Sequence, residues 1–82
     1  MEGGEIMTFI EYLRKDKGMS QVQLSRELKI NSTAIAQLEK GYRKSWPKLR
    51  EQLSKILDVK EDVLFDEEGW PRKVHVDIPK IN

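Results

Sequence analysis

The sequence predicts an all-α fold, a compact bundle of five short helices followed by a short extended C-terminal tail. Apolar residues recur at intervals of three and four positions in several short segments, which is the pattern of amphipathic helices. Capping residues precede these segments and glycines often follow them, so the helix ends are marked. At 82 residues, the chain has room for one small domain. We expect that domain in residues 1–65 and the tail in residues 66–82.

The first helix is expected after a short head that contains Gly3 and Gly4, because glycine is a poor start for a helix. Four apolar residues then follow with the spacing of one helical face: Ile6, Phe9, Ile10 and Leu13. Gly18 is expected to stop the helix, since glycine favours the position just past a helix C-terminus. The spacing therefore predicts a helix from about residue 6 to residue 17.

The second helix begins with a strong capping signal. Ser20 and Gln23 form the pattern of a capping box. Three apolar residues of this helix are available for burial: Val22, Leu24 and Leu28. The pattern predicts a short helix that ends near Lys29.

The third helix follows closely. Asn31 is the next favourable N-cap, and the helix is expected to run to about Lys40 and to stop at Gly41. Its apolar positions are Ala34, Ile35 and Leu38. Because about three residues separate the second helix from the third, the pair has the signature of a helix-turn-helix.

Two more helices and a strand are predicted in the second half of the chain. Ser45 is expected to cap a fourth helix, with Pro47 in its first turn. This helix offers Leu49, Leu53, Ile56 and Leu57 for burial, and a final turn over residues 60–65 adds Val63, Leu64 and Phe65. In the tail, Val74, Val76 and Ile78 alternate with polar residues, as in a strand. A lone strand is unstable in water, so this strand must pair with something or remain mobile.

The outer face of the predicted third helix carries no charge. On a helical wheel with about 100° per residue, the apolar positions share one side. The opposite side carries Ser32, Thr33, Ala36 and Gln37. Hydroxyl, amide and methyl groups suit the edges of base pairs in the major groove. The alternative is a surface helix that carries polar residues by chance.

Positive and negative charges are unevenly distributed, although fifteen basic and fourteen acidic residues give a net charge of +1. Residues 40–50 hold five bases and no acid, and residues 61–68 hold five acids and no base. A basic loop directly after the third helix would lie along the phosphate backbone beside the groove. A solvated loop is the alternative, and the neutral helix face next to the loop favours the DNA interpretation.

Residues 20–41, SQVQLSRELKINSTAIAQLEKG, resemble the helix-turn-helix of the Cro/C1-type family, also called the Xre family. The resemblance covers about residues 6–65 and implies a lambda-repressor-like bundle. Seven positions fit the family pattern: Ser20, Gln21, Leu24, Ile30, Ile35, Glu39 and Gly41. Ser25 stands where the family usually has alanine, and Lys29 stands where it often has glycine. Trp46 is bulky for its loop.

The resemblance also implies roles for individual residues. Base contacts are implied for Ser32, Thr33, Ala36 and Gln37. Contacts with the phosphate backbone are implied for Gln21, Asn31, Lys40, Tyr42, Arg43 and Lys44. Arg14 and Glu39 match a structural ion pair that ties the first helix to the third in some members. Two independent solvated charges are the alternative for this pair.

We therefore expect a sequence-specific binder of double-stranded DNA that regulates transcription, as a repressor. As a homodimer it would bind a pseudo-palindromic operator with half-sites about 34 Å apart. Cro-like proteins dimerise through a terminal strand, so the tail is the expected dimer strand. The alternative is an antitoxin-like or other protein-interaction module, whose tail would add a strand to a partner protein.

Other classes of protein are disfavoured. The chain has no cysteine, which excludes disulfides, zinc–cysteine sites and thiol nucleophiles. We find no long apolar run for a membrane span and no signal segment, and we expect a cytoplasmic protein. No metal-ligand cluster or cofactor motif is recognisable, so we expect no cofactor, no metal and no enzyme activity. His75, the only histidine, is expected at the surface of the tail.

Overall fold

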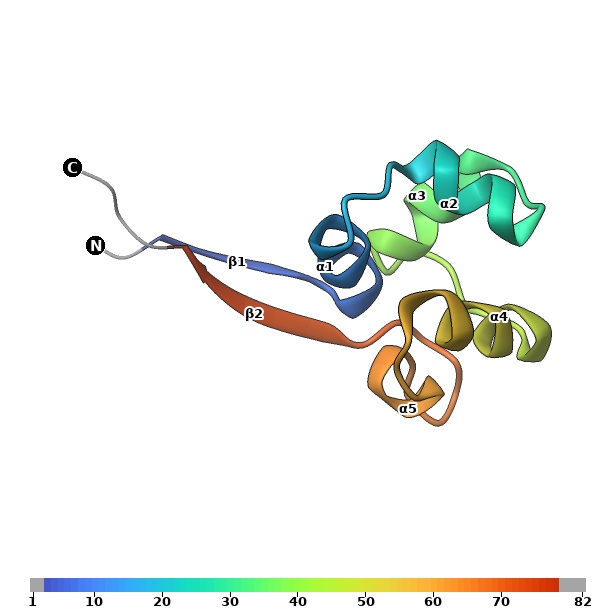
Figure 1. Cartoon of the computed structure of the whole chain (residues 1–82). Helices are drawn as coiled ribbons and strands as arrows, with labels where there is room; N and C mark the ends of the chain where they lie inside the picture. The colour runs from blue at the N-terminus through green and yellow to red at the C-terminus, as the bar shows by residue number, and fades with distance from the viewer. Residues whose placement is uncertain (1–2, 79–82) are drawn as a thin grey trace.

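The computed structural model describes residues 3–78, which form five helices and a two-stranded antiparallel sheet (Figure 1). The elements in chain order are β1 (Gly3–Thr8), α1 (Phe9–Asp16), α2 (Gln21–Leu28), α3 (Ser32–Glu39), α4 (Pro47–Leu57), α5 (Glu61–Leu64) and β2 (Lys73–Ile78). The prediction of an all-α fold is therefore wrong. The helices match the expected bundle, but the two ends of the chain meet in a sheet.

The two strands form a ribbon that projects away from the helices (Figure 1). Its register places Ile6 opposite His75 and Thr8 opposite Lys73. The strand expected in the tail is present, and its partner comprises the end of the predicted head and the first residues that had been assigned to the first helix. That helix begins at Phe9 instead of residue 6, because the extended Thr8 is its N-cap and accepts the N–H of Glu11 at 3.3 Å. Ile6 continues the helical spacing by coincidence.

The core lies between the helices. Its buried residues are Ile10, Leu24, Leu28, Ile35, Leu38, Leu49, Leu53, Leu57, Leu64 and Phe65. Val22 was expected among them but is 48% exposed, because it lies on the outer side of α2. The remaining expected core positions of α2 and α3 are buried, so the helical pattern predicted the inward faces well.

Two departures from the family pattern, Ser25 and Lys29, are accommodated within α2 and at its end. The capping box of Ser20 and Gln23 is confirmed, as is the Asn31 cap of α3. Lys29 ends α2 with φ 57° and ψ 40°, a left-handed conformation that costs a non-glycine residue free energy but keeps the turn short. Ser25 is buried, and its hydroxyl donates to the Val22 carbonyl at 2.7 Å, so its polar group is satisfied.

Ser45 does not cap α4, contrary to the prediction. The N-cap is Trp46, whose side chain makes no capping hydrogen bond. The Ser45 hydroxyl instead donates to the Gly69 carbonyl at 2.6 Å and accepts from Arg50 Nη1 at 3.1 Å. A hydrogen bond to a residue distant in sequence therefore replaces the expected local cap. This bond ties the loop before α4 to the turn after α5.

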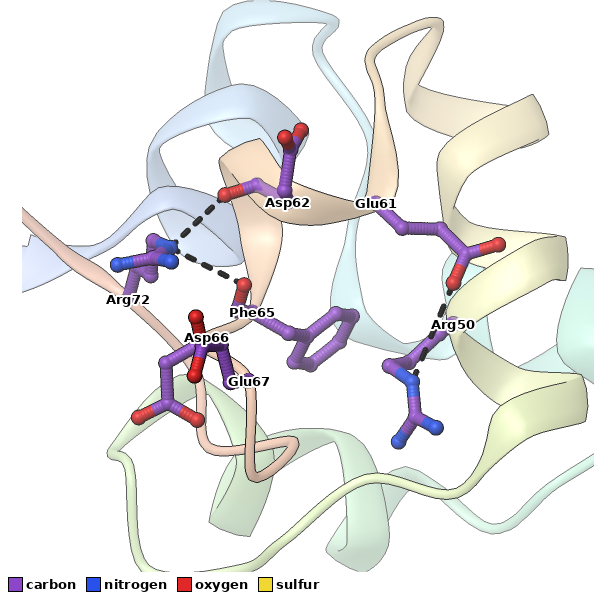
Figure 2. Close-up of a pocket in the computed structure, with 7 residues that line it drawn as sticks. All are labelled: Arg50, Glu61, Asp62, Phe65, Asp66, Glu67 and Arg72. Atoms are coloured by element: carbon purple, nitrogen blue, oxygen red, sulfur yellow. Dashed lines mark hydrogen bonds and ion pairs between the residues drawn. The ribbon is translucent and has the colours of Figure 1, made fainter.

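The segment between α5 and β2 is held by its own polar contacts. Figure 2 shows Arg72 beside the C-terminal end of α5, where its Nε donates to the carbonyls of Asp62 at 2.8 Å and Phe65 at 3.0 Å. The Asp66 carboxylate accepts the backbone N–H of Trp70, which lowers the pKa of Asp66 below its ordinary value. These contacts fix the direction in which the chain leaves the bundle and enters β2.

Candidate nucleic-acid interface

Helix α3 presents a neutral, solvent-facing surface. Ser32, Thr33 and Gln37 are exposed and Ala36 is half-buried. The opposite side of the helix packs into the core through Ile35 and Leu38. The four residues to which base contacts were assigned therefore lie together on the outward side, and their hydroxyls and amide are accessible to a partner.

The C-terminal end of α3 is held by a buried polar network around Glu39. Arg14 makes two contacts with the Glu39 carboxylate, one from Nε and one from Nη2 at 3.0 Å. Gln21 Nε2 also donates to this carboxylate, at 3.0 Å. The buried Thr8 hydroxyl donates to the Glu39 backbone carbonyl at 2.9 Å. Helices α1 and α2 and strand β1 thus all fix the orientation of α3.

This network changes what Gln21 can contribute to DNA binding. One N–H of its side-chain amide is engaged with Glu39, which leaves a single amide N–H for another acceptor. Gln21 is nevertheless the first residue of α2, and the backbone N–H groups of a helix N-terminus attract anions. Asn31 uses its side-chain oxygen to accept the N–H groups of Thr33 and Ala34, which leaves its amide nitrogen as a donor.

The basic loop after α3 is open to solvent. The side chains of Lys40, Tyr42, Arg43 and Lys44 are all exposed. The sequence analysis missed Lys73, which the ribbon brings to the same place: its Cε lies 3.5 Å from where a Cβ on Gly41 would stand. Only the pairing of β2 with β1 places Lys73 there, and no local signal indicated that pairing.

Trp46 is a second residue whose place in the site was missed. The Arg43 guanidinium carbon lies 5.3 Å from the centroid of the Trp46 ring, within the range of a cation–π contact. The available signal was an aromatic residue three positions after an arginine in a basic loop. The sequence analysis treated its bulk only as a departure from the family pattern.

The acidic segment, residues 61–68, lies around α5 and adjoins the later part of the basic segment, where Ser45 is bonded to Gly69. Helix α5 is at the opposite end of the bundle from α2 (Figure 1). Figure 2 shows a hollow beside α5 that is lined by Glu61, Asp62, Phe65, Asp66, Glu67 and two arginines, Arg50 and Arg72. Arg50 Nε is 3.9 Å from Glu61, and Arg72 is hydrogen-bonded to backbone carbonyls. The negative charge at this end disfavours contact with a phosphate backbone.

Between residues 3 and 78, no group of three or more histidine, cysteine, aspartate or glutamate side chains could hold a metal ion. No helix in that range is long and apolar enough to cross a bilayer.

Comparison with known proteins agrees with this arrangement. A helix-turn-helix family model matches residues 10–64, from α1 to the end of α5. No curated protein and no solved structure shows significant similarity to the chain. The matched range includes the neutral face of α3, the basic loop and the Glu39 network except for Thr8. The chain therefore belongs to the Cro/C1-type, or Xre, family of helix-turn-helix DNA-binding regulators.

Proposed function

We propose that the protein is a sequence-specific repressor that binds double-stranded DNA and inserts α3 into the major groove. The observation that carries the proposal is the neutral, exposed face of α3 next to a loop of exposed basic side chains. Neutral polar groups can read the edges of base pairs without being attracted to phosphates. The basic side chains of the loop can hold the DNA backbone beside the groove. A protein bound in this way occludes its operator from other DNA-binding proteins.

The proposed contacts fall into two classes. Specificity comes from Ser32, Thr33, Ala36 and Gln37. Position and affinity come from backbone contacts by Gln21, through its N–H, and by Asn31, Lys40, Tyr42 and Lys44. Lys73 adds a positive charge to the second class. It is the first residue of β2, and it lies beside Gly41 of the basic loop.

Replacing Gln37 with Ala tests this assignment of residues to base contacts and backbone contacts. Selection of bound fragments from genomic DNA would first identify the operator. The substitution is then expected to cost about 1–3 kcal/mol at one base position of each half-site and to relax the preference there, because a bidentate amide contact is lost. Binding of Gln37→Ala to a panel of single-base operator variants provides the measurement.

Lys44→Ala is the matched comparison for Gln37→Ala. It removes a charge from the same surface and is expected to weaken binding to all sequences alike, with no change in base preference. An equal loss across all operator variants for Gln37→Ala would contradict the assignment of Gln37 to base reading. Failure of the wild-type protein to enrich any sequence would contradict the proposed function itself.

We propose that the ribbon joins two copies of the chain into a homodimer. The ribbon has two strands, and such a pair is marginal in water without further packing. Ile6, which faces outward on the ribbon, is 71% exposed. Edge-to-edge pairing with a second ribbon would satisfy the open strand edges and cover this side chain. Six residues of strand span roughly 20 Å, a length that suits two bundles on half-sites about 34 Å apart.

Deleting residues 73–82 is expected to abolish the dimer. The truncation should end after Arg72, because Arg72 holds α5 through its side chain and accepts the Phe9 N–H through its carbonyl. The shortened protein is expected to have the mass of a monomer in light scattering. Its affinity for the full operator should fall by about 10²–10⁴-fold, since the second half-site no longer adds to the first.

Deleting residues 79–82 is the control for this truncation, because it retains β2. An unchanged mass for the protein that lacks residues 73–82 would contradict a ribbon-mediated dimer. Loss of a different co-purifying protein, with no change in self-association, would instead favour the antitoxin-like alternative.

A further inference from the structure

A surface hollow of about 530 Å³ lies beside the outward face of α3. Its polar lining comes from Asn31, Thr33 and Gln37 at α3 and from Arg43 in the basic loop, and Trp46 forms one of its sides. The hollow therefore joins residues proposed to read bases with one that the resemblance had assigned to the phosphate backbone. The inference below rests on the proposed function and concerns this same surface.

The Arg43 guanidinium contacts the Trp46 ring and is not bonded through its N–H groups to any described residue. It lies over the Trp46 ring at 5.3 Å from guanidinium carbon to ring centroid. Within residues 3–78, no hydrogen bond or ion pair engages the guanidinium, and the side chain is exposed. A guanidinium placed over a ring keeps its N–H donors available, while the contact with the ring limits where the group can lie.

Trp46 is itself firmly placed. It is the N-cap residue of α4, and its half-buried side chain packs against the hydrophobic core. The preceding residue, Ser45, is bonded to the Gly69 carbonyl through both its N–H and its hydroxyl. The indole is therefore a fixed platform at the edge of the hollow, in a loop that would otherwise be free to move.

We infer that Arg43 reads a guanine in the major groove and that Trp46 is the residue that positions it. A phosphate contact needs a positive charge in roughly the right place, which an unconstrained lysine or arginine supplies. Guanine O6 and N7 need two parallel N–H donors in one plane, and a guanidinium that is held beside the hollow with its donors free supplies them. Because Arg43 shares the hollow with Gln37 and Thr33, the guanine would lie next to the base pairs that α3 reads.

Selection of bound sequences from a random duplex pool tests the inference with four variants and the wild type. Arg43→Lys keeps the charge but loses the planar fork. It is expected to lose one guanine preference per half-site and roughly 5- to 150-fold in affinity for the best site, with an unchanged dependence on salt. Trp46→Leu should lose the same preference, and Trp46→Phe should retain it because a ring remains. Lys44→Ala should weaken all sequences and keep the guanine preference.

The outcomes separate the possible failures. If Arg43→Lys keeps the wild-type sequence preference, Arg43 is a backbone contact and the inference is overturned. If Trp46→Leu, folded by circular dichroism, keeps the guanine preference that Arg43→Lys has lost, the positioning role of Trp46 is overturned. If the wild type enriches no sequence, the proposed function fails, and the inference fails with it. Loss of the same guanine in Arg43→Lys and Trp46→Leu, with retention in Trp46→Phe, establishes the pair.

Discussion

Replacing Arg14 with Met is expected to lower the free energy of unfolding by about 3–5 kcal/mol, because it leaves the buried Glu39 carboxylate without its cation. Glu39 is 3% exposed and Arg14 is 7% exposed, so water cannot substitute for the lost contacts. Methionine retains a flexible apolar stem, which limits the cavity left behind. Thermal unfolding followed by circular dichroism should show a midpoint lower by at least about 12 °C for a domain of this size.

Lys15→Met, one position along the same helix, provides the matched control. Lys15 pairs with Glu11 at 2.8 Å, but its side chain is 54% exposed. An exposed pair of this kind contributes roughly 0.2–1 kcal/mol, so this substitution should change the midpoint little. Equal effects of the two substitutions would contradict a special role for the Arg14–Glu39 pair.

A second variant separates charge burial from packing. Combining Arg14→Met with Glu39→Met removes both charges, and such a replacement of a buried pair is often neutral in stability. The double variant is therefore expected to be more stable than Arg14→Met alone. Its DNA affinity should still be reduced, because Gln21 and Arg14 would no longer fix the end of α3 through Glu39. Stability and recognition would then respond differently to the same pair.

Local signals in the sequence predicted the helices well, because caps and apolar spacing act over three or four residues. Ser20 and Gln23 satisfy each other within one turn, and Asn31 caps the next helix within two residues. The sheet has no such local signal. Ile6 meets His75 only through the folded bundle, and the cap at Thr8 was hidden by apolar spacing that continued through it. Contacts between the ends of a chain depend on the whole topology.

In the candidate site too, some features follow from local sequence and others depend on the tertiary fold. The outward positions of α3 follow from helix periodicity alone, so the exposed Ser32, Thr33 and Gln37 could be located from the sequence. The hydrogen-bond partner of Gln21 could not be located from the sequence, since its amide meets Glu39 only after α2 and α3 have packed together. The approach of Lys73 to the basic loop likewise requires the ribbon.

The salt dependence of DNA binding is expected to be steep despite the net charge of +1. Four positive side chains lie on the surface that we propose faces DNA in each subunit of the proposed dimer: Lys40, Arg43, Lys44 and Lys73. Lys40, Lys44 and Lys73 are proposed phosphate contacts and Arg43 is inferred to lie in the groove, so on the order of four positive charges per subunit displace counterions from the DNA. The logarithm of the dimer's affinity should then fall with the logarithm of salt concentration at a slope of roughly −7. Between 50 and 200 mM salt the affinity should then fall by on the order of 10⁴-fold. Fluorescence anisotropy on the selected operator measures this slope.

The slope depends on where the charges lie and not on their sum. It therefore tests the uneven distribution of basic and acidic side chains over the molecule. Lys44→Ala removes two phosphate contacts per dimer and should flatten the slope by about 2, whereas Gln37→Ala should leave it unchanged. A slope near zero, or an unchanged slope for Lys44→Ala, would show that the basic side chains after α3 do not meet the DNA backbone.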